Sequence, residues 1–253
     1  MPEYTFDARG SKVRWTEITG DLPAQVFLHG LGGTGAAAFG HIAGDPALGG
    51  HRSLVIDLPG HGSSDRPEGW DYTIDSFADV VAGMLVQAGL DAVDLIGHSM
   101  GGSIAIVLAY RQPQLVGRLV ISEANLDPLP RSPTGLGSQR ISAQSEEAFV
   151  AAGYQALLDA ESSWAPTLGL CDPRAVHRSA VGVVTGTRPT MREMLLSLRI
   201  PRMFIRGELG EELRGAAGLE AAGVRVVTLA RAGHVTMVDE PAAFVEVLAT
   251  ALR

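Results

Sequence analysis

Lysine, cysteine and asparagine are almost missing from this chain of 253 residues. Lys12, Cys171 and Asn125 are the only residues of their types, so the chain can form neither an intramolecular disulfide nor a thiolate cluster around a metal. The arginines that supply nearly all of the positive charge are scattered along the chain, and the formal net charge is −8. This distribution argues against nucleic acid and anionic membrane surfaces as main partners.

Long apolar runs are missing as well. No run approaches the roughly 18 apolar residues that a membrane-spanning helix needs. The first ten residues, MPEYTFDARG, carry charges where a secretory signal peptide needs an apolar stretch. We therefore expect a cytoplasmic protein that does not act at a membrane, and the sequence carries no signal for its oligomeric state.

The apolar residues that are present follow the pattern of a wound α/β fold. They make up 46% of the chain against 19% charged residues, which is enough for a sizeable core. Short apolar runs alternate with longer segments of helical spacing. The segments YTFDARG and KVRWTEI predict an antiparallel pair, and six apolar runs predict buried parallel strands covered by helices on both faces. These six strands are expected at residues 24–28, 53–58, 92–97, 118–124, 202–207 and 224–230.

Four helices are expected between and after these strands, at residues 73–89, 100–112, 211–222 and 239–252. The last one has clear start signals. Asp239 is placed to cap it, and Pro241 suits its first turn.

Residues 125–200 break the alternation because they contain no convincing strand. The segment NLDPLPRSPTGLGSQ is typical of a loop, and helical segments follow at residues 145–160, 172–185 and 189–199. We expect a helical lid inserted over the sheet, with residues 1–124 and 201–253 forming one core.

A nucleophile motif lies in AVDLIGHSMGGSIAIVLAY. Residues 97–101 match G-x-S-x-G, with a predicted strand before them and a predicted helix after them. A sharp strand-to-helix turn would strain the backbone of Ser99 and expose its hydroxyl, while Gly97 and Gly101 avoid collisions around it. Gly102 would let the helix approach the sheet. Ser99 is therefore the predicted nucleophile.

A serine hydroxyl needs a base, and His234 is the best candidate. It follows the last predicted strand in VVTLARAGHVTMVDEP and precedes the final helix. His98 is expected to point away across the turn and to pack, and His61 is expected to be a hydrogen-bonded loop residue. The remaining competitors are His29, His41, His51 and His177.

The glycine-rich segment VFLHGLGGTG has two interpretations. Gly30, Gly32 and Gly35 match the dinucleotide-binding spacing G-x-G-x-x-G, and Asp57 lies further on as such a site requires. Alternatively, the turn holds backbone N–H groups ready for an oxyanion. A dinucleotide site would leave the serine motif without a purpose, so the second interpretation is favoured and Asp57 becomes a residue at the end of a strand.

Four ordered motifs together resemble the α/β-hydrolase family. They are HGLGG, DLPGHGSS, GHSMGG and the AGH before the last helix, and the resemblance spans nearly the whole chain. It implies an eight-stranded, mostly parallel sheet with a lid after the sixth strand. It also implies an oxyanion hole made by the backbone N–H groups of Leu31 and Met100.

The acid of the catalytic triad departs from the family's commonest pattern. After the seventh strand the chain reads RGELGEE, and Gly210 stands where the aspartate is usual. Some family members carry the acid at the end of the sixth strand, where this chain has Glu123. A carboxylate that ends a buried strand needs a partner, so Glu123 is the preferred acid. Glu208 is the main alternative, with Glu211 and Asp127 behind it.

These residues predict acyl transfer through an acyl-enzyme on Ser99. The expected substrate is a small or medium apolar carboxylic ester or lactone, and neither a cofactor nor a metal is needed. Leu31, Leu126 and Trp164 are the expected substrate contacts. Other apolar residues of the lid are weaker candidates for the pocket, because apolar residues at helical spacing usually form core. They are Phe149, Tyr154, Leu157, Leu168, Val183, Met191 and Leu195.

Two alternatives use the same residues differently. The first keeps the triad but changes the reaction, to acyl transfer to an alcohol, perhydrolysis or cleavage of a carbon–carbon bond beside a ketone. The second is a receptor that binds a ligand with a hydrolase fold and little turnover. Product analysis with competing acceptors and ligand-binding measurements would separate them.

Overall fold

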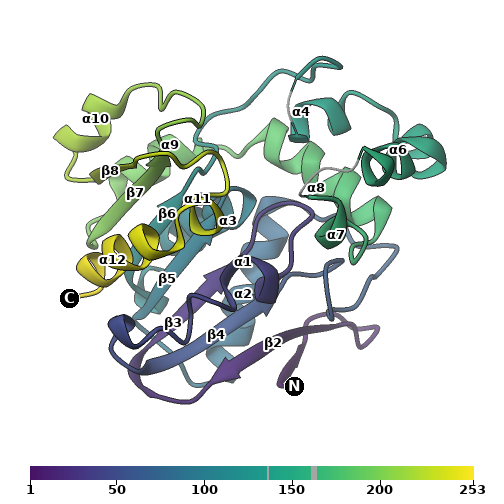
Figure 1. Cartoon of the computed structure of the whole chain (residues 1–253). Helices are drawn as coiled ribbons and strands as arrows, with labels where there is room; N and C mark the ends of the chain where they lie inside the picture. The colour runs from purple at the N-terminus through teal and green to yellow at the C-terminus, as the bar shows by residue number, and fades with distance from the viewer. Residues whose placement is uncertain (136, 161–163) are drawn as a thin grey trace.

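The fold is an eight-stranded sheet with helices on both faces (Figure 1). The computed structural model describes residues 1–135, 137–160 and 164–253. The sheet order is β1-β2-β4-β3-β5-β6-β7-β8. Strand β2 runs antiparallel to both of its neighbours, β1 and β4, and strands β3 to β8 run parallel to one another. The strands are β1 (Glu3–Thr5), β2 (Lys12–Ile18), β3 (Asp21–Leu28), β4 (His51–Asp57), β5 (Val93–His98), β6 (Val116–Ser122), β7 (Arg202–Gly207) and β8 (Arg225–Leu229).

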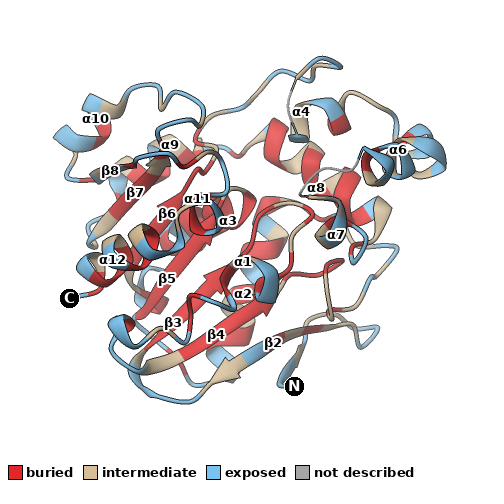
Figure 2. Ribbon diagram, viewed as in Figure 1, coloured by how far each residue is buried: buried red, intermediate tan, exposed pale blue. Residues whose placement is uncertain are grey.

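The mostly parallel eight-stranded sheet predicted from the sequence is therefore confirmed. Every predicted strand is present, with bounds that differ by a few residues. The central strands are buried along nearly their whole length, as β5 shows most clearly in Figure 2. Strands covered on both faces read as continuous apolar runs, which is why the sequence located them well.

Two hydrophobic clusters fill the spaces on either side of the sheet. The larger cluster packs α2 (Ile74–Gln87), α3 (Met100–Arg111) and α10 (Ala216–Ala221) against one face. The smaller one packs α1 (Gly35–Phe39) and α12 (Pro241–Ala251) against the other. Helix α3 is buried along almost its entire length, so its sequence carries little amphipathic pattern.

The ends of two predicted helices need correction. Helix α10 begins at Ala216, later than expected, since residues 211–213 have no regular structure and residues 214–215 form a turn. The C-terminal helix begins after Glu240 with Pro241 in its first turn, as expected for the proline. The expected cap was wrong, since Asp239 ends a separate short helix, α11 (Thr236–Asp239), and its carboxylate accepts a hydrogen bond from Gly233 N.

Short helices occupy the segment between β6 and β7. The expected helices appear as α5 (Glu146–Ala148), a π-helical turn η3 (Phe149–Gly153), α6 (Tyr154–Asp159), α8 (Pro173–Thr185) and α9 (Met191–Ser197), and two were not expected, α4 (Gly137–Ser142) and α7 (Ala165–Leu168). A separate set of buried residues, here called the insertion cluster, joins several of them. It consists of Ile141, Phe149, Leu157, Leu168, Cys171, Val176 and Ala180. The division into a core and a lid remains a prediction.

Across the ranges that the structure describes, helices are too short or too polar to meet the requirements of a membrane span.

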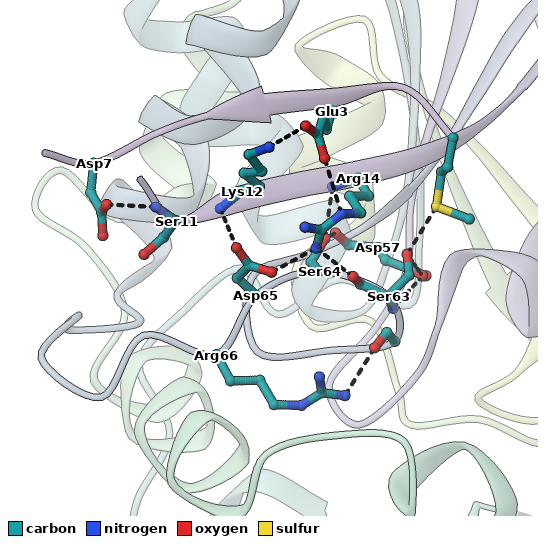
Figure 3. A network of polar contacts seen from close by, with 12 residues as sticks. Glu3, Asp7, Ser11, Lys12, Arg14, Asp57, Ser63, Ser64, Asp65 and Arg66 are labelled. Carbon is teal, nitrogen blue, oxygen red and sulfur yellow. Dashed lines mark hydrogen bonds and ion pairs between the residues drawn. The ribbon is translucent and has the colours of Figure 1, made fainter. Parts of the chain in front are cut away.

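Asp57 ties together the two glycine-rich loops that follow β3 and β4. Its carboxylate accepts hydrogen bonds from Gly35 N at 2.8 Å and from the N–H and hydroxyl of Ser63 at 2.9 and 2.8 Å. A side chain at Gly62 would lie 2.4 Å from this carboxylate, so the loop requires glycine there. The same loop reaches the N-terminal hairpin, because Ser64 Oγ accepts from Arg14 N and Asp65 pairs with the Arg14 guanidinium (Figure 3). Asp57 thus has a structural role at the end of β4.

Replacing Asp57 by alanine should lower the free energy of unfolding by about 2–4 kcal/mol. The change removes three hydrogen bonds to a charged acceptor and leaves two backbone N–H groups to find water. Urea denaturation measures the loss, with Asp21→Ala as the control, because Asp21 is exposed. Equal stability of the two variants would show that the carboxylate does not hold the loops.

Candidate active site

Ser99 lies in a tight turn between β5 and α3. Its backbone angles are φ 51° and ψ −117°, which a residue with a side chain rarely adopts. The turn is anchored by a hydrogen bond from Ser99 N to the carbonyl of Ser122, at the end of the neighbouring strand β6. Strain of this kind survives only where the surrounding structure enforces it.

Three glycines make this turn possible through close backbone contacts. A Cβ atom on Gly97 would lie 2.4 Å from the carbonyl oxygen of Gly101, and one on Gly101 would lie 2.2 Å from that of Leu28. A Cβ on Gly102 would lie 2.7 Å from the side chain of Ala124 on the β6 side. The helix therefore approaches the sheet at a distance that larger residues would prevent.

The structure brings Ser99, His234 and Glu123 together in one line. His234 Nε2 lies 3.1 Å from Ser99 Oγ, and His234 Nδ1 lies 3.4 Å from Glu123 Oε2. The side chain of His234 is 52% exposed, whereas that of Glu123 is 6% exposed. The imidazole thus stands between solvent and a buried carboxylate.

Glu123 directly follows β6 and is held from several directions. Its φ is 52°, a second strained position at the same edge of the sheet. Its backbone N–H donates to Ile205 O, and its Oε1 accepts from Gly207 N at 2.6 Å, so both contacts come from β7. A Cβ on Gly210 would lie 2.9 Å from Oε1. The carboxylate of Glu123 therefore fills the space beside Gly210.

The alternative acids make other contacts. Glu208 accepts a hydrogen bond from the backbone N–H of Arg231 at 3.0 Å. Asp127 forms an ion pair with Arg192, in which the shortest N–O distance is 2.7 Å. Glu211 is exposed. Of the four carboxylates considered from the sequence, Glu123 is the one paired with His234.

The loop that carries His234 is fixed through its backbone. Asp239 accepts from Gly233 N at 2.8 Å, and Arg231, at a φ of 62°, pairs with Glu240. Together with the bond from Arg231 N to Glu208, these contacts hold both sides of the turn before the histidine. Asp239 and Glu208 thus support this loop, whereas the sequence predicted Asp239 as a helix cap and Glu208 as an alternative acid.

His98 does not point away from the site, contrary to expectation. Its Nε2–H donates to the carbonyl of His234 at 2.8 Å, and the two rings lie 5.0 Å apart. Burial, followed by the nearby charge of His234, lowers the pKa of His98 to about 3. His98 therefore packs as a neutral ring, as expected, but its contact is with the backbone of the proposed base.

Two further histidines lie buried behind the glycine-rich loops. His29 donates from Nδ1 to Gly30 O at 2.7 Å and accepts at Nε2 from Leu58 N at 3.0 Å. His61 donates from Nδ1 to Pro59 O at 3.0 Å, which confirms it as a hydrogen-bonded loop residue. Burial lowers the pKa of both, and that of His61 falls to about 3, with the neighbouring His29 as the next cause.

The predicted oxyanion donors lie on the two turns that meet at Ser99. A Cβ on Gly30 would lie 3.2 Å from Ser99 Cβ, which places the Leu31 turn beside the nucleophile. Met100 is the first residue of α3, where backbone N–H groups have no partner within the helix. Among the described residues, neither Leu31 N nor Met100 N donates to another protein group. Both N–H groups therefore lack a protein acceptor in the described part of the chain.

The predicted substrate contacts divide by burial. Leu126 is 4% exposed and belongs to the larger core cluster, so its side chain offers almost no surface to a ligand. Leu31 and Trp164 are half-buried. The other apolar residues proposed for the pocket are mostly core. Phe149, Leu157 and Leu168 lie in the insertion cluster, and Val183, Met191 and Leu195 lie in the larger cluster.

Comparison with known proteins identifies the family of the chain. The family model of the alpha/beta hydrolase fold matches residues 23–149. An esterase of Mycobacterium tuberculosis is 33% identical over 162 residues, which cover 62% of this chain and 50% of the esterase. An esterase of Exiguobacterium antarcticum superposes with a TM-score of 0.81 at 20% identity, covering 100% of this chain and 99% of that one. The enol-lactonase of Burkholderia xenovorans gives a TM-score of 0.76 at 21% identity, covering 99% of both chains.

The chain therefore belongs to the α/β-hydrolase family. The chain spans between 30% and 50% of the length of several curated relatives that it matches. The structural neighbours establish the fold.

Buried neutral histidines should make the fold sensitive to acid. Unfolded histidine titrates near pH 6.5, whereas His61 and His98 bind a proton only near pH 3 in the folded state. Below pH 6.5 the unfolded chain thus binds more protons, and stability falls as the pH falls. Between the folded and unfolded pKa values, each of the two histidines lowers the free energy of unfolding by about 1.4 kcal/mol for each pH unit of acidification.

Urea denaturation at pH 7, 6 and 5 measures this loss before most carboxylates titrate. His61→Asn should reduce the slope below pH 6 by about the share of one histidine, since its amide can still donate to Pro59 O. A free energy of unfolding that stays constant from pH 7 to 5 in the unmodified protein would contradict the prediction.

Proposed function

We propose that the chain is a serine hydrolase that cleaves a small or medium apolar carboxylic ester or lactone. The observation that carries this proposal is the 3.1 Å approach of His234 Nε2 to Ser99 Oγ, with Glu123 on the other side of the imidazole. A hydroxyl becomes a useful nucleophile when a base within hydrogen-bond reach can take its proton. Ser99 is the nucleophile, His234 the base and Glu123 the acid that orients it.

In the first half of the reaction Ser99 Oγ attacks the carbonyl carbon of the substrate. The new bond forms as the hydroxyl proton passes to His234 Nε2, and the carbonyl electron pair moves onto its oxygen. The N–H groups of Leu31 and Met100 hold this oxyanion, in positions fixed before the substrate arrives. The tetrahedral state then collapses, and His234 gives its proton to the leaving oxygen.

In the second half, water replaces the leaving alcohol. His234 takes a proton from the water, whose oxygen attacks the acyl carbon on Ser99, and the same two N–H groups hold the second oxyanion. Collapse returns the proton to Ser99 Oγ and releases the acid. With a lactone, the alcohol and the acid are the two ends of one product.

Glu123 serves the reaction by fixing the imidazole. Its Oε2 faces His234 Nδ1, which favours the tautomer whose Nε2 is free to accept the serine proton. Its negative charge also stabilises the imidazolium that forms. Because Gly207 N–H holds Oε1, the carboxylate keeps its place while His234, more exposed, takes and gives protons.

The surroundings of the site favour a neutral, apolar substrate. Leu31 and Trp164 supply half-buried apolar surface beside the proposed oxyanion hole. Arg231, which lies three residues before His234, pairs with Glu240, and Arg192 pairs with Asp127. The esterase and enol-lactonase neighbours make esters and lactones a reasonable first choice. We infer that residues 125–200 act as the lid that selects the acyl group.

Ser99→Ala and Glu123→Ala test the proposal in p-nitrophenyl ester hydrolysis. Glu123→Ala should lower kcat by roughly 10⁴-fold, as the loss of an orienting acid does in other triads. Glu208→Ala should lower it by no more than about tenfold, because its loss removes one backbone hydrogen bond worth about 1 kcal/mol. Ser99→Ala should abolish acyl-enzyme turnover.

Gly210→Asp supplies a sharper control in the Glu123→Ala background. Position 210 lies beside the lost carboxylate and does not have a left-handed backbone angle, so an aspartate there can approach His234 Nδ1. Part of the activity should return in the double variant, whereas Gly210→Asp alone should impair the enzyme by colliding with Glu123. An active Glu123→Ala protein together with an inactive Glu208→Ala protein would contradict the assignment.

A further inference from the structure

We propose that Trp164 is a positioning residue, which holds the Leu31 turn in the conformation that aims its N–H at the oxyanion. This inference rests on the proposed function. The carrying observation is a hydrogen bond of 3.0 Å from Trp164 Nε1–H to the carbonyl of Leu31, across a separation of more than a hundred residues in the chain.

The orientation of Leu31 N–H depends on the peptide plane between Gly30 and Leu31. Gly30 O accepts from His29 Nδ1–H at 2.7 Å and from Gly33 N at 3.1 Å. Because this peptide bond is trans, Leu31 N–H points away from those two donors. One side of the turn is therefore fixed by His29 and Gly33, which belong to the same loop.

The other side of the turn is fixed by Trp164. The indole N–H holds Leu31 O, and the ring lies directly on Gly32, where a Cβ would come within 2.7 Å of the indole atoms. Gly32 has a φ of 66°, so the turn reverses direction under the ring. Without this contact, only the hydrogen bonds to Gly30 O would restrain the backbone of Leu31.

Trp164 is itself held by the helices between β6 and β7. It packs, together with Leu31, against the insertion cluster. Cys171, a member of that cluster, points its thiol at Gly33 O at 3.7 Å, and burial raises its pKa to about 12. Tyr154 Oη–H lies within hydrogen-bond distance of the carbonyls of Leu168 and Cys171, which fixes the chain on the C-terminal side of the tryptophan. The insertion thus contacts the turn at two carbonyls, those of Leu31 and Gly33.

A positioning role and a simple pocket wall predict different kinetics. A wall contacts the substrate in its ground state, so its loss raises KM or changes the preferred acyl length. A residue that orients an oxyanion donor acts when charge develops on the carbonyl oxygen, so its loss lowers kcat and leaves KM unchanged. Trp164→Phe separates the two roles, since it keeps an aromatic ring over Gly32 but removes the N–H.

The experiment compares ester hydrolysis with inhibition by an aryl trifluoromethyl ketone. Addition of Ser99 Oγ to the ketone carbon, with the proton passing to His234, creates an oxyanion like that of the reaction. Trp164→Phe should lower kcat by about three- to tenfold at unchanged KM, the loss expected from one neutral hydrogen bond. The affinity for the ketone should fall by the same factor. Trp164→Leu should add a change in acyl-length preference.

Trp70→Phe is the matched control, because Trp70 is a half-buried indole that packs on Phe6, Tyr72 and Phe77. It should leave kcat, KM and ketone affinity unchanged, and thermal unfolding checks that all variants fold. A Trp164→Phe protein with unchanged kcat, whether KM rises or not, overturns the positioning role. Failure of the proposed function gives another pattern, in which Ser99→Ala retains full activity and the ketone does not inhibit the unmodified protein.

Discussion

The parallel run of the central strands is the constraint on which the site depends. Strands β5, β6, β7 and β8 all end at the same edge of the sheet, so the residues that follow them meet there although they are far apart in sequence. Ser99 follows β5, Glu123 follows β6, and His234 lies in the loop after β8. Crossover helices are the necessary consequence of parallel pairing, and they leave this edge open to ligands.

Backbone strain at this edge converts proximity into a defined geometry. Both Ser99 and Glu123 have positive φ angles, and each is held by a hydrogen bond to the adjacent strand. The close contacts at Gly97, Gly101 and Gly102 show how tightly α3 is set against the sheet. The strained residues are two of those proposed to react or to orient the base, which is where strain is usually found in enzymes.

Sequence reasoning located the strands and the three aligned residues because each leaves a local signal. Buried parallel strands read as apolar runs, the turn at Ser99 requires glycines at set positions, and a glutamate at the end of an apolar strand is costly without a partner. The position of His98 left no such signal. Its contact is with the backbone of His234, which only the folded loop brings within reach. The role of Asp239 was missed for a similar reason, because a carboxylate before Pro241 fits a helix cap equally well.

The central claim is that His234, oriented by Glu123, activates Ser99. Reaction with a fluorophosphonate tests it most directly, because a bond forms between the phosphorus and an activated serine oxygen as fluoride leaves. Peptide mapping by mass spectrometry should find one adduct, on Ser99, formed far more slowly in His234→Ala. An adduct on another residue, or ester hydrolysis by a protein whose Ser99 does not react, would contradict the account.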